Sequence, residues 1–124
     1  MVSKFSFLIL ADNSGGRFFK CIALKRLYKS VCAGFIIKGV IKKLRKKRRS
    51  FSRVKKGSFY NGLVIQSRSI LIRKNGKKFF SSKNLIIILG KENEPLATRI
   101  FNGVPKEARK KKKSKLLIMA PFIY

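Results

Sequence analysis

The sequence predicts a mainly β fold: a small closed five-stranded β-barrel with a protruding β-hairpin and a short C-terminal helical element. Short apolar runs rich in Ile, Leu, Val and Phe recur along the chain, and turn-forming residues separate them. Asn75-Gly76 lies between two β-prone arms, a pattern typical of a hairpin. A set of about five strands of this size favours closure, because a closed barrel has no exposed edges that would aggregate.

The predicted strands differ in the arrangement of their apolar residues. The run at 35–42 places Phe35, Ile37 and Ile41 on one side and lysines on the other, which indicates a half-buried strand. The run at 85–89 is continuously apolar, too short for a typical helix and β-branched enough for a buried strand. The five predicted strands are residues 5–10, 18–24, 35–42, 63–65 and 85–89.

Residues 11–17 form a predicted tight turn between the first two strands. Asp12, Asn13 and Ser14 have side chains that can hydrogen-bond nearby backbone amides, and Gly15 and Gly16 tolerate positive φ. We therefore expect the chain to reverse direction here, with Asp12 capping the turn.

Two loops are predicted before the fourth strand. Residues 26–33 read as a loop, and residues 42–56 form the most basic stretch of the chain. Because so many like charges cannot pack together, we expect 42–56 to be an extended loop ordered only by phosphates. The alternative is a solvated charged surface. Phe51 within this stretch could pack on the barrel or stack on a base.

The second half of the chain carries turn and helix signals. Residues 70–80 predict a hairpin with a type I′ turn and a basic tip. Residues 90–95 predict a polar turn. Pro105 suits the first turn of a short helix at 105–111, where Glu107 would lie near the positive end of the helix dipole. Residues 116–119 predict one or two helical turns that end before Pro121.

The composition indicates one basic domain. The chain has 124 residues, of which 45% are hydrophobic, so residues 1–124 predict a single domain with a barrel at about 1–100 and the C-terminal helical element at about 101–124. The formal net charge is +28. A small compact body with this charge repels itself strongly unless a polyanion surrounds it, which favours nucleic acid as the partner. The charge alone does not choose RNA over DNA or an anionic membrane.

The sequence argues against enzymatic, metal-binding and membrane-spanning roles. Histidine is absent, and the nearby pair Glu92 and Glu94 lies in a predicted polar turn, so we expect no catalysis, no metal and no cofactor. Cys21 and Cys32 are expected to be small buried hydrophobic residues. No apolar run approaches the length of a membrane span. No leading targeting segment is recognisable, so we expect that any presequence has been removed or that none is needed.

Ordered motifs give the chain a family resemblance over nearly its whole length. It resembles the universal large-subunit ribosomal protein fourteen family, whose members carry Ala-Asp-Asn-Ser-Gly-Ala, Gly-Thr-Arg-Ile-Phe-Gly, Glu-Leu-Arg and Leu-Ala-Pro in that order. The matching residues are Ala11-Asp12-Asn13-Ser14-Gly15-Gly16 with Cys21-Ile22 following, Ala97-Thr98-Arg99-Ile100-Phe101-Asn102-Gly103, Glu107-Ala108-Arg109 and Met119-Ala120-Pro121. The chain departs from the family at Ala97 and at Asn102-Gly103, and its stretch 42–49 is unusually basic.

The resemblance implies a structural, non-enzymatic protein of the large ribosomal subunit. It implies a five-stranded barrel with a β-ribbon and two short C-terminal helices, on the subunit face that meets the small subunit. The implied partners are large-subunit rRNA, small-subunit rRNA at intersubunit bridges, and the neighbouring ribosomal proteins three and nineteen. In the family, the Thr-Arg pair that Thr98 and Arg99 match is also used by a ribosome-silencing factor. The predicted intersubunit face comprises Asn13, Ser14, Gly15, Thr98 and Arg99.

The basic loops are predicted to supply phosphate contacts to rRNA, with specificity coming from the shape of the folded RNA. The candidate contacts are Arg17, Arg45, Lys47, Arg48, Arg49, Arg53, Lys55, Arg73, Lys77, Arg99 and Arg109.

The predicted location is a mitochondrial ribosome with an organelle-encoded gene, because heavy use of Phe, Ile, Lys, Asn and Ser suits an AT-rich genome. A plastid or bacterial ribosome is the alternative. Two rival functions remain open. A free single-stranded nucleic-acid-binding barrel would need aromatic residues on an exposed groove, whereas we expect most of them in strand-core positions. A membrane-surface basic protein would need an amphipathic helix.

Overall fold

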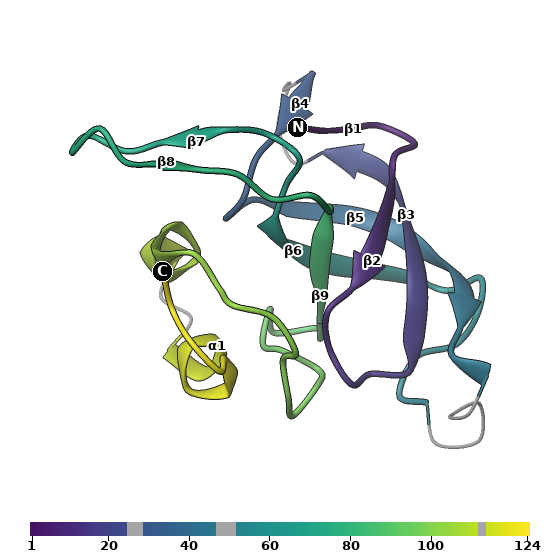
Figure 1. The fold of residues 1–124 in the computed structure, drawn as a ribbon. Helices are drawn as coiled ribbons and strands as arrows, with labels where there is room; N and C mark the ends of the chain where they lie inside the picture. The colour runs from purple at the N-terminus through teal and green to yellow at the C-terminus, as the bar shows by residue number, and fades with distance from the viewer. Residues whose placement is uncertain (25–28, 47–51, 112–113) are drawn as a thin grey trace.

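Five strands close into a barrel in the order β2-β3-β5-β6-β9, which confirms the predicted fold class (Figure 1). The structure is a computed structural model that describes residues 1–24, 29–46, 52–111 and 114–124. The barrel strands are β2 (Phe7–Leu10), β3 (Gly16–Leu24), β5 (Ile36–Leu44), β6 (Phe59–Gln66) and β9 (Leu85–Leu89). All neighbours pair antiparallel except β2 and β9, which run parallel and join the two ends of the sheet.

Strand β9 is buried on both faces, and this explains its continuously apolar sequence. Ile86 and Ile88 lie in the barrel interior with Leu8, Phe19 and other core residues. Leu85, Ile87 and Leu89 belong to a second core, which also contains Ile100, Val104, Ala108 and Leu116 of the C-terminal segment. The C-terminal segment therefore covers the outside of the barrel over β6 and β9, and hydrophobic burial fixes it there.

Strand β6 is longer than the three residues that the sequence predicts. It starts at Phe59, and its first three residues are exposed or half-buried and do not form an apolar run. Gly62 occurs where β6 and β9 approach closely: a Cβ atom there would lie 2.4 Å from the Ile86 Cδ1 atom. The pairing of Gly62 with Ile88 shows that this residue belongs to the strand despite its low strand preference.

The predicted loop at 26–33 is wrong in part. Residues 25–28 lie outside the described part of the chain, but β4 (Ser30–Val31) pairs antiparallel with β1 (Val2–Ser3). Val2 and Val31 are both buried against the barrel interior. This two-stranded sheet depends on a partner far away in the sequence, so the local pattern contains no sign of it.

The hairpin exists as β7 (Leu71–Ile72) and β8 (Lys78–Phe79), but the predicted type I′ turn is wrong. That turn requires positive φ at Asn75 as well as Gly76, and only Gly76 has it, at 76°. Instead the Gly76 amide donates to the Arg73 carbonyl and the Arg73 amide to the Lys77 carbonyl. These bonds close a three-residue loop with glycine in the left-handed position.

The C-terminal segment contains a 3₁₀ helix (Lys106–Lys111) and the short helix α1 (Ser114–Met119), in agreement with the two predicted helical pieces. Glu107 does more than interact with a helix dipole, since both its carboxylate oxygens accept bonds from Arg73, at 2.8 and 3.0 Å. Arg73 also donates to the main-chain oxygen of Tyr124 and stacks on Phe79. These contacts tie the hairpin to the C-terminal segment.

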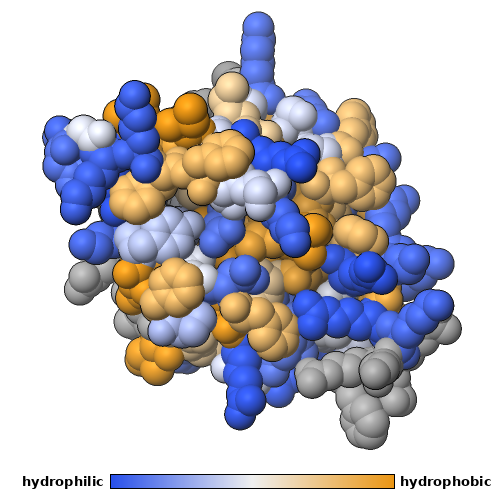
Figure 2. Space-filling model, viewed as in Figure 1, coloured by the Kyte–Doolittle hydropathy of each residue, from blue (hydrophilic) through white to orange (hydrophobic). Residues whose placement is uncertain are grey.

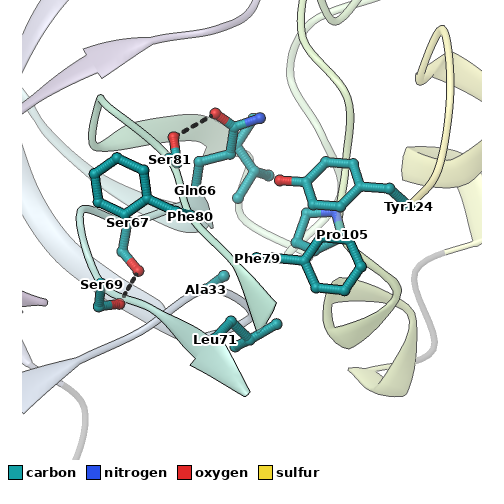
Figure 3. Close-up of a pocket in the computed structure, with 11 residues that line it drawn as sticks. Ala33, Gln66, Ser67, Ser69, Leu71, Phe79, Phe80, Ser81, Pro105 and Tyr124 are labelled. Atoms are coloured by element: carbon teal, nitrogen blue, oxygen red, sulfur yellow. Dashed lines mark hydrogen bonds between the residues drawn. The ribbon is translucent and has the colours of Figure 1, made fainter. Parts of the chain in front are cut away.

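A small pocket lies between the hairpin and the end of the chain (Figure 3). The Phe79 and Tyr124 rings face each other with centroids 5.5 Å apart, and Ser81 donates to the Gln66 side-chain oxygen. The cavity of about 20 Å³ has room for about one water molecule, so it reflects packing between two elements and not a ligand site.

Candidate nucleic-acid interface

A buried carboxylate organises the turn between β2 and β3. Asp12 is fully buried, and its Oδ1 atom accepts bonds from the Ser14 amide and hydroxyl at 3.1 and 2.5 Å. Its Oδ2 atom accepts the Ile88 amide of β9 at 3.0 Å. Burial raises the pKa of the Asp12 carboxyl above its ordinary value, and the hydrogen bonds and the nearby Arg45 guanidinium oppose that rise. Asp12 caps the turn, as predicted, and also joins it to the opposite strand.

Asn13 connects the turn to residues 98 and 99. Its Oδ1 atom accepts the Thr98 and Arg99 amides at 3.0 and 3.2 Å, and its Nδ2 donates to the Thr98 hydroxyl at 2.8 Å. The backbones also pair, because the Phe101 amide donates to the Ala11 carbonyl at 2.8 Å. The two longest motifs of the sequence therefore form one site, with Thr98 and Arg99 exposed.

The same turn holds both ends of the basic stretch. The Gly15 carbonyl accepts the Arg45 amide and the Ser14 carbonyl accepts the Arg53 amide, each at 2.9 Å. Gly15 has φ of 103°, and a Cβ atom there would lie 2.5 Å from the Ser52 Cβ, so this position requires glycine. The expectation that 42–56 is ordered only by phosphates is therefore wrong at both ends: residues 42–44 continue β5, and the turn fixes residues 45 and 53. Residues 47–51 lie outside the described part.

Two arginines at this end of the barrel are oriented by the chain itself. Arg45 donates to the Leu10 carbonyl at 3.3 Å and lies over the Phe101 ring. Arg53 donates to the Leu96 carbonyl at 2.7 Å. A guanidinium has five N–H donors, so each keeps donors for an external phosphate. These contacts hold the groups in place and lower the entropy cost of binding an anion.

We call the surface formed by residues 11–17, 43–46, 52–55 and 96–101 the corner end of the barrel. In Figure 1 the turn between β2 and β3 and the segment after β9 lie together at the lower end of the barrel, opposite the hairpin. Among the candidate contacts, Arg17, Arg53, Lys55 and Arg99 are exposed there, and Arg45 is half-buried.

Lys77 and Arg73, the other candidate contacts whose side chains the structure describes, belong to the hairpin and not to the corner end. Lys77 is exposed at the hairpin tip, and Figure 2 shows hydrophilic side chains projecting from the hairpin. The Arg73 guanidinium is mostly buried in its contacts with Glu107, Tyr124 and Phe79. Lys47, Arg48 and Arg49 lie outside the described residues, and so does the side chain of Arg109.

Comparison with known proteins decides between the possible polyanion partners. A protein-family model described as Ribosomal protein L14p/L23e matches residues 1–124. The chain belongs to the ribosomal protein L14p/L23e family. It is a non-enzymatic structural constituent of the large ribosomal subunit that binds large-subunit rRNA. The +28 charge and the fixed basic groups of the corner end are consistent with this role in the L14p/L23e family.

The expected burial of aromatic residues in this L14p/L23e protein is wrong. Six phenylalanines among the described residues are exposed, and Phe19 is fully buried. The exposed ones are Phe5, Phe7, Phe59, Phe80, Phe101 and Phe122. Strand alternation places Phe7 and Phe59 on the outside of the barrel, where the C-terminal segment does not cover them. Sequence pattern alone does not tell the inside of a barrel from its outside when both carry apolar residues.

The cysteine prediction holds for Cys21, which is buried, but Cys32 is only partly buried and accepts a weak bond from Ser69. Within the described residues, no cluster of three or more Cys, Asp or Glu side chains could hold a metal ion. No helix in that part of the chain is long and apolar enough to cross a membrane.

We predict that Asp12→Asn destabilises the fold by about 1–3 kcal/mol. The amide offers one oxygen where the carboxylate accepts three bonds, and its NH₂ group faces a buried donor. The free energy of unfolding can be measured by urea titration followed by circular dichroism. Glu92→Gln, in an exposed turn, is the matched control and should change stability by less than about 0.5 kcal/mol. Equal stability of the two variants would contradict the structural role of Asp12.

Proposed function

We propose that the corner end is the main surface by which this protein binds large-subunit rRNA. One observation carries this proposal. A single turn holds the Thr98-Arg99 pair through Asn13 and also holds both ends of the basic stretch. Arg17, Arg45, Arg53 and Lys55 are the proposed phosphate contacts in the described part of this surface, and Lys47, Arg48 and Arg49 would extend it. Lys77 and Arg109 are proposed as contacts outside the corner end. Arg73 has the weakest support, because its guanidinium already binds within the chain.

We further propose that Thr98 and Arg99 present an intersubunit face that bridges to small-subunit rRNA. Both are exposed, and Asn13 holds their backbone. Ser14 and Gly15 are buried, so their proposed part in this face is to shape it from beneath. A ribosome-silencing factor that occupies Thr98 and Arg99 would compete with the bridge.

The finer placement in the ribosome is also a proposal. We propose that ribosomal proteins three and nineteen are its neighbours. We also propose that residues 1–124 form one domain, in which the second core joins the barrel to the C-terminal element. The abundance of Phe, Ile, Lys, Asn and Ser supports a mitochondrial ribosome with an organelle-encoded gene. A plastid or bacterial ribosome is the alternative.

We predict that the double variant Arg17→Ala/Lys55→Ala binds large-subunit rRNA with a weaker salt dependence. Each lost phosphate contact should reduce the slope of log K against log salt by about one, so the slope should fall by about two. Filter binding over a range of salt concentrations measures this. The control Lys4→Ala/Lys29→Ala removes the same charge beside β1 and β4 and should leave the slope almost unchanged.

Equal loss in the two double variants would show that binding follows total charge and not the corner end. Tighter binding to an unstructured oligonucleotide than to folded rRNA would favour the rival single-stranded nucleic-acid-binding barrel.

We predict that Thr98→Ala/Arg99→Ala weakens the association of large with small subunits while the protein stays bound in the large subunit. Loss of hydrogen bonds from a charged group should cost roughly 1.5–3 kcal/mol of association free energy. Sucrose-gradient sedimentation at several magnesium concentrations would measure it. Unchanged association, with the variant present in the particles, would contradict the proposed intersubunit face.

A further inference from the structure

A groove at the corner end has features that phosphate binding does not require. It lies between the start of β6 and the end of β9 and has a volume of about 340 Å³, within the roughly 300–1,000 Å³ range of small-molecule sites. Its lining includes two aromatic residues, Phe59 and Tyr60, the amide Asn61, and the cations Arg53 and Lys91. The Arg53 bond to the Leu96 carbonyl joins this groove to the rest of the corner end.

The aromatic residues differ in exposure. Phe59 is 63% exposed, although it lies in a barrel strand opposite Val40, which is largely buried. Tyr60 is half-buried, and its hydroxyl accepts the Lys55 amide at 3.2 Å, which orients its ring. Exposure of the apolar Phe59 ring to water is unfavourable. An occupant that covers this ring would therefore gain the free energy of burying it.

The polar groups of the groove can recognise a nucleotide. No other described residue forms a hydrogen bond with the Asn61 side chain, so its amide can pair with a base edge. Arg53 keeps donors beyond the one bound to Leu96, and Lys91 is exposed. Neither carboxylate of the adjacent turn lines the groove, and Glu94 is paired with Lys115 at 2.8 Å. The charge next to the rings is therefore positive.

We propose that this groove holds one unpaired nucleotide of large-subunit rRNA. The base stacks on Phe59, Asn61 contacts its edge, and Arg53 and Lys91 bind the flanking phosphates. Aromatic rings beside cations are how proteins hold unpaired nucleotides, since every base offers a face for stacking. The inference rests on the rRNA binding of the family and deepens the proposed function, because it adds a base contact to a surface otherwise assigned to phosphates.

The test measures binding of the full chain to protein-free large-subunit rRNA at several salt concentrations. Phe59→Ala should bind roughly 5- to 150-fold more weakly, the range for loss of one stacked base. The salt slope should stay unchanged, because stacking releases no counterions. Phe59→Leu should be almost as weak, whereas Phe59→Trp should bind like the wild type. Phe80→Ala removes a ring from the hairpin that is 74% exposed and is the matched control.

Four outcomes would overturn the inference. If Phe59→Ala binds rRNA with the affinity of the wild type, no base stacks on Phe59. The proposed function would still stand in that case, because the wild type binds rRNA. Wild-type affinity of Phe59→Leu would show that an apolar contact is enough. Ultraviolet cross-linking of assembled subunits should join residues 59–61 to a nucleotide, and a cross-link to another protein would show a protein segment in the groove. A wild type that ignores rRNA would overturn the proposed function as well.

Discussion

The hydrogen bonds around the buried Asp12 carboxylate hold the corner end of this molecule together. Asp12 joins the first turn of the chain to β9, Asn13 joins the same turn to Thr98 and Arg99, and the carbonyls of Ser14 and Gly15 hold both ends of the basic stretch. Each of these bonds spans a long sequence separation. A turn of five residues, 11–15, therefore positions groups from three parts of the chain, and its polar side chains are used to hold the structure.

The chain combines this corner with two apolar cores and a large positive charge. Hydrophobic burial on both faces of β9 fixes the barrel and its C-terminal cover, so the lysines and arginines can remain on the outside. At +28, the folded chain repels itself, and rRNA phosphates relieve that repulsion in the ribosome. Buried apolar residues thus stabilise the fold, while lysines and arginines on the surface carry the charge. This separation lets a small protein present many cations without losing its core.

The sequence predicts the strands and the family more reliably than the contacts. Runs such as residues 85–89 predict strands because burial on both faces leaves a continuous apolar pattern. The β1–β4 pair and the hairpin loop type could not be predicted, since one depends on a distant partner and the other on φ at Asn75. Asp12 and Asn13 were recognised as turn residues, but their bonds to Ile88, Thr98 and Arg99 depend on barrel closure. The exposure of Phe59 could not be predicted, because the sequence predicts that this strand starts only at residue 63 and an outward-facing phenylalanine looks the same in sequence as a core phenylalanine.

A density map of the large ribosomal subunit that contains this protein would test most directly whether the corner end is the functional surface. The account predicts rRNA phosphates within hydrogen-bond distance, roughly 2.7–3.2 Å, of the cations of the corner end, with Thr98 and Arg99 on the side that faces the small subunit. A map in which the turn at residues 11–17 and its attached segments face solvent, while the opposite end of the barrel carries the rRNA, would contradict it.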